Sequence, residues 1–136
     1  MTKVVITKKL LIFFSAAFFI FNSQLSSAQA EFSFEQKTKK FPKTPAGEIL
    51  SFDYKFVNSG NLPLIITDIK VNCPCTKFTF PKEPILPEQK GVITVTFDTK
   101  SKIGYQDRML EIYSNAKISP FEIRFKGMVD HKNPIR

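Results

Sequence analysis

Apolar and polar residues alternate with period two over most of the chain. In residues 48–57 every second residue is apolar: Leu50, Phe52, Tyr54 and Phe56. This alternation is typical of a β-strand that buries one face. Residues 92–98 and 121–129 repeat the pattern. Outside residues 1–30, which are treated below, no segment has a convincing helical period, so we expect an all-β domain.

The same pattern predicts further strands at residues 64–71, 76–80 and 108–114, and a short first strand at 32–34. In the first of these we expect Ile65, Ile69 and Val71 to share one face, although the first residues of the segment, 64–66, are apolar on both sides. Turn formers separate the segments, among them Asn58-Ser59-Gly60-Asn61, Pro81, Pro84, Pro87, Gly104 and Ser114-Asn115. About seven short strands at this spacing predict an immunoglobulin-like antiparallel sandwich.

The N-terminal residues have the order of a secretory signal peptide. Three lysines precede an apolar run at residues 10–21, and a polar stretch ends in Ala28-Gln29-Ala30. The run is shorter than the 18 or more residues of a membrane span. We expect a signal helix at residues 1–30 that is cleaved after Ala30, with an uncleaved anchor as the alternative. Such a signal predicts export. We expect the periplasm as the location, with the cell surface or the medium as alternatives.

Removing residues 1–30 from the 136 leaves 106, and removing their three lysines lowers the net charge from +8 to +5. That length suits one sandwich domain at residues 31–130 with a polar tail at 131–136. Two cysteines are too few for a disulfide scaffold. With His131 as the single histidine, no base-plus-nucleophile arrangement is visible. We therefore expect no enzyme activity, no catalytic residues and no cofactor.

Cys73-Pro74-Cys75 is the segment of the chain whose residue types and spacing indicate chemical reactivity or metal binding. The first interpretation is a disulfide. It requires a turn at Pro74, because side chains two residues apart in a strand stand roughly 6.6 Å apart. Such a ring would be strained and suited to redox exchange. The second is a soft-metal site, above all for Cu(I), although two thiolates are few ligands. The third is structural, with one cysteine packed as a small hydrophobe.

The run from Asn58 to Thr76, Asn-Ser-Gly-Asn-Leu-Pro-Leu-Ile-Ile-Thr-Asp-Ile-Lys-Val-Asn-Cys-Pro-Cys-Thr, resembles the core motif of an exported bacterial family, domain of unknown function 1573. The landmarks downstream, from Pro84-Ile85-Leu86-Pro87 to Ser114-Asn115, are similar as well, and the resemblance spans about residues 34–129, nearly all of the mature chain. The family usually has Gly where this chain has Pro74. The resemblance implies export and a sandwich related to hydin-type and sperm-protein-type domains, and it implies no established activity.

Two other groups of residues are candidates for a role. In the turn after residue 57, Gly60 is able to take a left-handed conformation and the Asn58 side chain to bond its own backbone. The stretch Lys37–Pro45 is expected to be a basic connection between strands. Its lysines are candidates for binding an anionic glycan or membrane surface, with a solvated connection as the alternative: Lys37, Lys39, Lys40 and Lys43.

Two functions follow from these observations. The first is an exported, non-catalytic interaction or structural module, whose partner is another exported or cell-envelope protein bound for example by strand addition. The alternative is redox or copper handling through Cys73 and Cys75. Export argues against nucleic acid as a partner.

Overall fold

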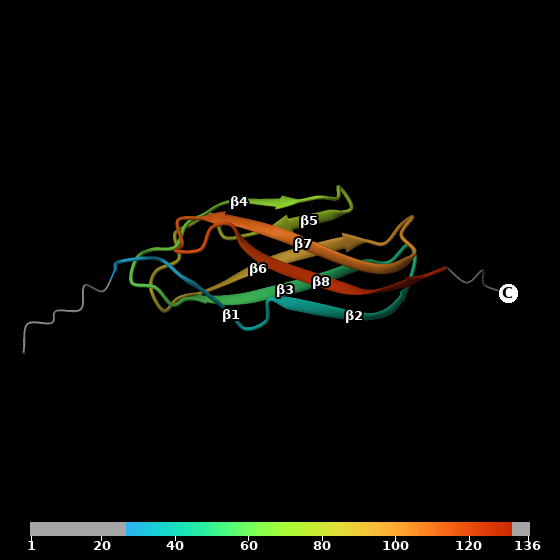
Figure 1. Ribbon diagram of the computed structural model, residues 1–136, viewed down its shortest axis with the longest axis horizontal. Coiled ribbons are helices and arrows are strands. Elements are labelled where there is room, and N and C mark those ends of the chain that lie inside the picture. Colours follow the sequence, from blue (N-terminus) through green and yellow to red (C-terminus); the bar gives the residue numbers. More distant parts are fainter. Residues whose placement is uncertain (1–26, 132–136) are drawn as a thin grey trace, which may run out of the picture.

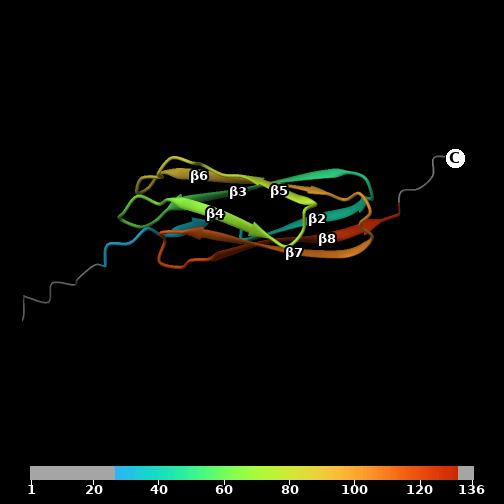
Figure 2. The same ribbon diagram turned by 90° about the horizontal axis from the view of Figure 1, so that it is seen from above.

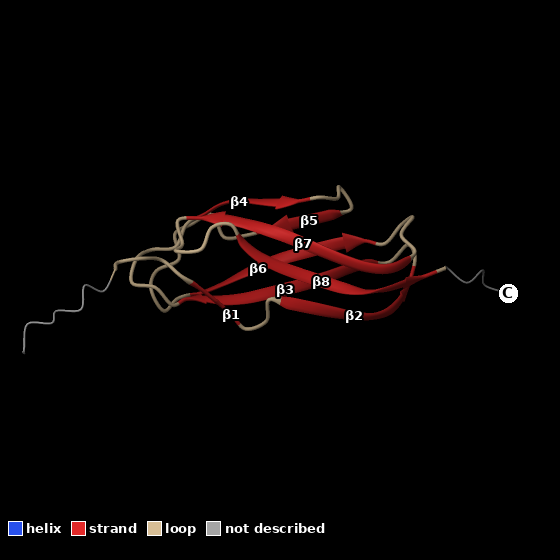
Figure 3. Ribbon diagram, viewed as in Figure 1, coloured by secondary structure: helices blue, strands red, loops and turns tan. Residues whose placement is uncertain are grey.

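The computed structural model describes residues 27–131, and the described chain is all β, as predicted (Figure 3). The predicted signal helix, apart from residues 27–30, and the tail after His131 lie outside the described residues. Among the described residues there is no helix long and apolar enough to cross a membrane. The strands are β1 (Phe32–Phe34), β2 (Thr38–Pro45), β3 (Ile49–Asn58), β4 (Ile66–Val71), β5 (Thr76–Thr79), β6 (Lys90–Asp98), β7 (Gly104–Ser114) and β8 (Phe121–Asp130).

The strands form two four-stranded sheets that pack face to face. The first sheet has the order β1-β3-β6-β5 and the second the order β2-β8-β7-β4. Figure 1 shows β1 and β2 along one long side of the molecule and β4 and β5 along the other, and the view in Figure 2 separates the two layers. The chain therefore switches sheets twice at the sides, between β1 and β2 and between β4 and β5. This arrangement is the predicted immunoglobulin-like sandwich.

The core lies between the sheets and consists of the side chains that the alternation placed inward. Tyr54 and Phe56 of β3 are fully buried. The expected inward residues of β6, β7 and β8 are buried as well: Ile93, Val95, Phe97, Leu110, Ile112, Phe121, Ile123, Phe125 and Val129. Phe rings contribute much of the contact, for example the stacked pair Phe52–Phe125, whose centroids are 5.0 Å apart across the sheets. Period-two alternation thus identified most of the core.

The prediction that Lys37–Pro45 is a connection was wrong, because Thr38–Pro45 is strand β2. Its partner is β8, and the pairing is parallel, unlike the antiparallel pairs elsewhere in the sandwich. Phe41 and Thr44 are the buried residues, and a register shift between them breaks the period. Pro42 lies at this irregularity, where an edge strand tolerates a residue without an N–H. The irregularity hid the strand from a strict period-two pattern.

In β4 the predicted inward facing is confirmed for Ile69 and for Val71, which is half-buried against the core, but it was wrong for Ile65. Ile66 and Ile69 are buried, whereas Ile65 is 41% exposed. The register of β4 against β7 shifts between Ile66 and Asp68. A bulge of this kind adds one residue and inverts the facing of the residues on one side of it.

Candidate functional site

The crossover from β4 to β5 contains the cysteines. The structure joins Cys73 and Cys75 in a disulfide with their Cα atoms 5.2 Å apart. The chain therefore turns at Pro74, since two rises of an extended strand would separate the atoms by roughly 6.6 Å. The Cys75 N–H donates to Cys73 Sγ at 3.3 Å, and Thr76 N–H donates to the carbonyl of Cys73 at 3.1 Å. These contacts define a compact covalent turn between the sheets.

The copper alternative finds no support in this arrangement. The two sulfurs are bonded to each other, so neither offers a thiolate to a soft metal ion. Within residues 27–131 no three His, Cys, Asp or Glu side chains gather closely enough to hold a metal ion.

Beyond the crossover, strand β7 lacks a neighbour on one edge. The pairing of β4 with β7 ends at Val71–Leu110, while β7 continues to Gly104 and pairs there with β8 alone. Residues 104–109 thus present one edge of backbone without a strand partner in the part of the chain that the structure describes. We call residues 104–109, together with the crossover residues 72–75 beside them, the notch.

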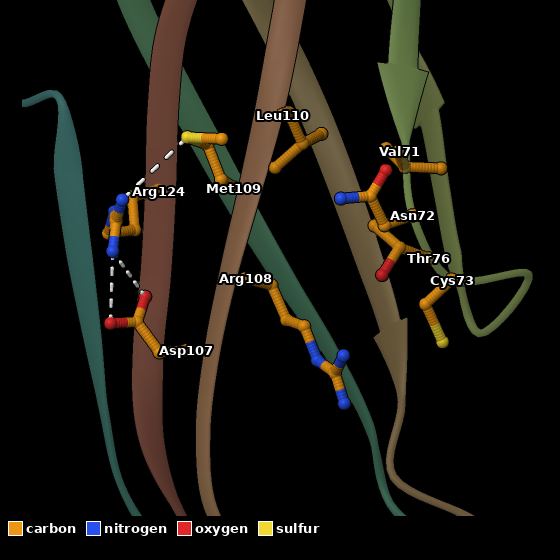
Figure 4. A pocket seen from close by; sticks show the side chains of 9 residues that line it. All are labelled: Val71, Asn72, Cys73, Thr76, Asp107, Arg108, Met109, Leu110 and Arg124. Carbon is orange, nitrogen blue, oxygen red and sulfur yellow. Dashed lines mark hydrogen bonds and ion pairs between the residues drawn. The ribbon is translucent and has the colours of Figure 1, made fainter.

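A cavity of about 240 Å³ lies in the notch (Figure 4). Four consecutive residues of β7, residues 107–110, line it, although their side chains alternate between the two faces of the sheet. Consecutive residues share one cavity because it lies on the strand edge itself. Its other lining residues come from the crossover region and from β8: Val71, Asn72, Cys73, Thr76 and Arg124.

Arg108 is the cation of the cavity without a carboxylate partner. It has the same inward phase on β7 as Leu110 and Ile112, which are fully buried. Its Nη2 donates to Gln106 Oε1 at 2.8 Å, while its buried Nε has no hydrogen-bond partner. Figure 4 shows the side chain leaving β7 on the side of Asn72, Cys73 and Thr76.

Arg124 lines the same cavity but is already neutralised. It lies with Asp107 on the opposite side of β7 from Arg108 (Figure 4), and its Nη1 contacts both Asp107 oxygens at 3.0 and 3.1 Å. Its backbone carbonyl accepts a hydrogen bond from the Tyr54 hydroxyl at 2.8 Å. Burial raises the pKa of Tyr54, so this hydroxyl keeps its proton. The free positive charge of the cavity therefore belongs to Arg108.

Sequence reasoning missed Arg108 and Gln106, although the signal was present. Both residues are separated from Leu110 and Ile112 by an even number of positions, so all four face the same side of β7. Of the four, Leu110 and Ile112 are apolar. A charged residue in the buried phase of a strand is uncommon unless it is paired. The alternation that identified the core was therefore enough to single out Arg108.

The turn at Asn58 and Gly60 is built around a buried side chain. Asn58 Oδ1 accepts the Gly60 N–H at 3.0 Å, and Asn58 Nδ2 donates to the carbonyls of Leu62 and Ile85 at 2.7 and 2.9 Å. Among the described glycines positive φ occurs at Gly47 and Gly104, so the left-handed conformation expected for Gly60 was wrong. A Cβ on Gly60 would instead overlap the backbone of residues 29–31. Close approach, not a positive φ, requires glycine there.

The two alanines of the expected cleavage site differ in their surroundings. Ala28 is exposed, whereas Ala30 is 1% exposed and belongs to the core. Ala30 forms a bridge with Ala116, and its carbonyl accepts the N–H of Lys117 at 2.9 Å. Ala30 is thus part of the folded sandwich.

The four candidate lysines of the stretch 37–45 have different surroundings. Lys37 Nζ lies 4.9 Å from the ring centroid of Phe121, and Lys39 Nζ donates to Gln36 Oε1 at 2.9 Å. Lys43 Nζ lies 2.8 Å from Asp130 Oδ2. Lys40 is exposed. Of the four, only Lys43 is paired with a carboxylate, so binding of an anionic surface by the other three stays a prediction.

Comparison with solved structures places the sandwich among known folds. A protein of unknown function from Porphyromonas gingivalis W83 is similar at a TM-score of 0.66 and 16% identity, over 77% of this chain and 50% of that one. The PapD-like domain 7 of human CEP192 is similar at a TM-score of 0.58 and 11% identity, over 82% and 93%. The secreted serine protease VesC from Vibrio cholerae is similar at 0.57 and 14%, over 81% and 25%. At these identities the likeness concerns the fold, and the chain spans half the length of the Porphyromonas protein.

No curated protein matches the sequence. The family model "Protein of unknown function (DUF1573)" matches residues 32–129, which includes every strand of the sandwich except the last residue of β8. The resemblance noted from the run Asn58–Thr76 is thereby confirmed. The chain belongs to the DUF1573 family.

Proposed function

We propose that the protein is an exported, non-catalytic interaction module that binds an extended segment of another exported or cell-envelope protein at the notch. The observation that supports this is the unpaired edge of residues 104–109. An added strand there would continue the line of β4 and bond its backbone to β7. Strand addition of this kind draws affinity from main-chain hydrogen bonds and specificity from side-chain pockets.

The edge strands of the two sheets are less suited to this role. Strand β1 has three residues, and β5 has four and is followed by Pro81. Strand β2 carries lysines and prolines, and β4 has a bulge. Short length, lysine, proline and bulges all discourage pairing at an edge. Residues 104–109 contain neither lysine nor proline.

The outer face beside the notch offers apolar contact area as well. Tyr105 is 61% exposed and lies opposite Met128, which is 41% exposed. Ile103, at the start of the stretch, is 52% exposed. Tyrosine and methionine are enriched at protein interfaces, where charged residues are depleted.

Photo-cross-linking in the living host tests this function. A photo-reactive phenylalanine derivative is placed at position 72 or position 105, at the two ends of the notch. Position 51 on the edge of β3, which is exposed and pairs with β6 alone, serves as the matched control. We expect positions 72 and 105 to label one short segment of one partner. The labelled residues should lie about four residues apart, roughly 13 Å in strand geometry.

Labelling of unrelated proteins, or equal labelling from position 51, would contradict the proposal. So would two adducts in the same partner whose spacing does not fit an extended segment.

A further inference from the structure

The cavity of the notch contains a cation without a counter-ion. Among residues 27–131 the ion pairs are Lys43–Asp130 and Arg124–Asp107. Arg108 takes part in neither, although its side chain is half-buried and its Nε is shielded from solvent. A buried N–H group without a hydrogen-bond partner is costly. The free protein carries this cost at a place where the chain also leaves a strand edge unpaired.

The size of the cavity indicates what it accepts. Its volume of about 240 Å³ lies below the ~300–1,000 Å³ that is usual for small-molecule sites. A single side chain of a docked strand is a better match. The guanidinium group presents donors in a fixed fork that suits a carboxylate. Asn72 and Thr76 add polar groups on the facing wall.

We infer that Arg108 binds the carboxylate of an Asp or Glu side chain that the docked segment directs into the cavity. This inference rests on the proposed function and names the chemistry of its partner: an extended peptide with an acidic residue at one inward position. Charge complementarity supports it, because Arg124 is already neutralised by Asp107 and the remaining charge of the cavity is positive. Gln106, which bonds to Arg108 Nη2, orients the guanidinium group.

Titration with designed peptides tests the inference. The probes are two end-blocked eight-residue peptides of alternating Thr and Val that differ only in Glu or Gln at one central position. They are added to the ¹⁵N-labelled exported form, and the backbone amide signals of residues 104–109 are followed by NMR. We expect the Glu peptide to bind at least about tenfold more tightly than the Gln peptide, as for a charge-assisted hydrogen bond.

A cation inside the cavity and one outside it provide variant and control. Arg108→Gln should abolish the preference for Glu, and Arg108→Lys should keep part of it because the charge remains. Lys55→Gln, which removes an exposed charge of β3 that does not line the cavity, should leave the preference intact. Unfolding curves recorded for each variant show that it is folded.

Equal affinity for the two peptides, or no response of residues 104–109 to either, would overturn the inference about Arg108. The proposed function would still be judged by cross-linking. A cross-linked partner segment without an acidic residue facing Arg108 would leave the function standing and the inference refuted. Cross-links outside the notch would refute both.

The packing of residues 29–31 supports a second, independent inference. The Gln29 N–H donates to Asn61 Oδ1 at 2.7 Å, and the Gln29 carbonyl accepts the Asn61 N–H at 3.0 Å. Ala30 is buried against Ala116, as described above. Cleavage after Ala30 would remove all of these contacts from the mature protein. Of the three backbone atoms that approach Gly60, only the Glu31 nitrogen would then remain.

We propose that the signal peptide is cleaved between Ala28 and Gln29. Ser26-Ser27-Ala28 has the small-x-small order that signal cleavage requires, and Ala28 is exposed. Water supplies a hydroxyl to the carbonyl carbon of Ala28 and a proton to the Gln29 nitrogen, which becomes the new amino terminus. That nitrogen still donates to Asn61 Oδ1, so the fold remains complete.

N-terminal sequencing and the intact mass of the exported protein decide this point. We expect a chain that begins at Gln29. Ala28→Leu should block processing, whereas Ala30→Leu should still be cut at the same bond. A native chain that begins at Glu31, an uncleaved native chain or a block by Ala30→Leu would overturn the proposal.

Discussion

On both long sides of the sandwich the chain switches from one sheet to the other, but the two sides end differently (Figure 1). In the second sheet, β2 pairs with β8 on the first side over residues 124–130, to the end of that strand. On the second side β4 pairs with β7 over residues 110–114 and then leaves for the other sheet. In this sheet one side is therefore covered by a long edge strand and the other is open at the notch, while in the first sheet of the described chain β3 pairs with β6 alone over residues 49–55.

The charged side chains differ as well. On the covered side Lys43 has a counter-ion in Asp130, while Lys37 and Lys39 contact the Phe121 ring and the Gln36 amide. At the notch the inward residues are Gln106 and Arg108, and the second of these has no counter-ion. Under the proposed function, the covered side serves the fold and the open side binds the partner.

The largest expected effect concerns the covered side. A Cβ on Gly127 of β8 would overlap the backbone carbonyl and ring of Phe41 in β2. Gly127→Ala should therefore lower the free energy of unfolding by about 3 kcal/mol, because overpacking forces the strands apart. Chemical denaturation measures the loss, and amide exchange should place it in β2.

The matched control is the same substitution at the notch. Gly104 has φ 86° with open space around its Cα, so Gly104→Ala adds backbone strain but no clash. Its cost should be about 1 kcal/mol. If Gly104→Ala were as harmful as Gly127→Ala, the notch would be as tightly packed as the covered side and the comparison would fail.

A smaller effect is expected when the disulfide is removed. The bond closes a loop of only three residues, and loop-closure entropy for so short a loop predicts a loss of about 1.5 kcal/mol. Cys73→Ser with Cys75→Ser should therefore fold, with faster amide exchange confined to residues 72–76. Wild-type protein treated with dithiothreitol provides the control and should lose a similar amount.

The double variant also separates the two functions considered for the cysteines. We expect cross-linking from position 105 to persist, since the interaction module does not require the sulfurs. Loss of cross-linking in a folded double variant would instead favour the redox alternative.

Most of the fold could be predicted from the sequence because most strands keep a strict period of two. Phe97 and Leu110 are buried where the alternation places them. The pattern failed at β2 and β4, where a register shift interrupts the period. A bulge depends on how two strands pair, and the sequence of one strand alone does not contain that information.

The candidate site was predictable only in part. The spacing of Cys73 and Cys75 indicated a place for chemistry, and the notch lies directly beside it. The unpaired edge itself was not predictable, because it depends on β7 continuing past the end of β4. Those two ends are far apart in sequence, and only the register of the sheet relates them.

The smallest expected effect concerns the ion pair on the covered side. The hydrogen bond from Lys43 holds the pKa of Asp130 below its ordinary value of 3.8, aided by a backbone hydrogen bond of His131. The resulting stabilisation is present above that ordinary value and is lost as the pH falls through the lowered pKa. Lys43→Gln should therefore raise the pKa of Asp130, which NMR of its carboxyl carbon measures, and Lys40→Gln is the control. The midpoint of denaturation at neutral pH should hardly change, because the pair is exposed and screened. A marked loss of stability would instead mean that charge, and not the pairing of β2 with β8, keeps that side covered.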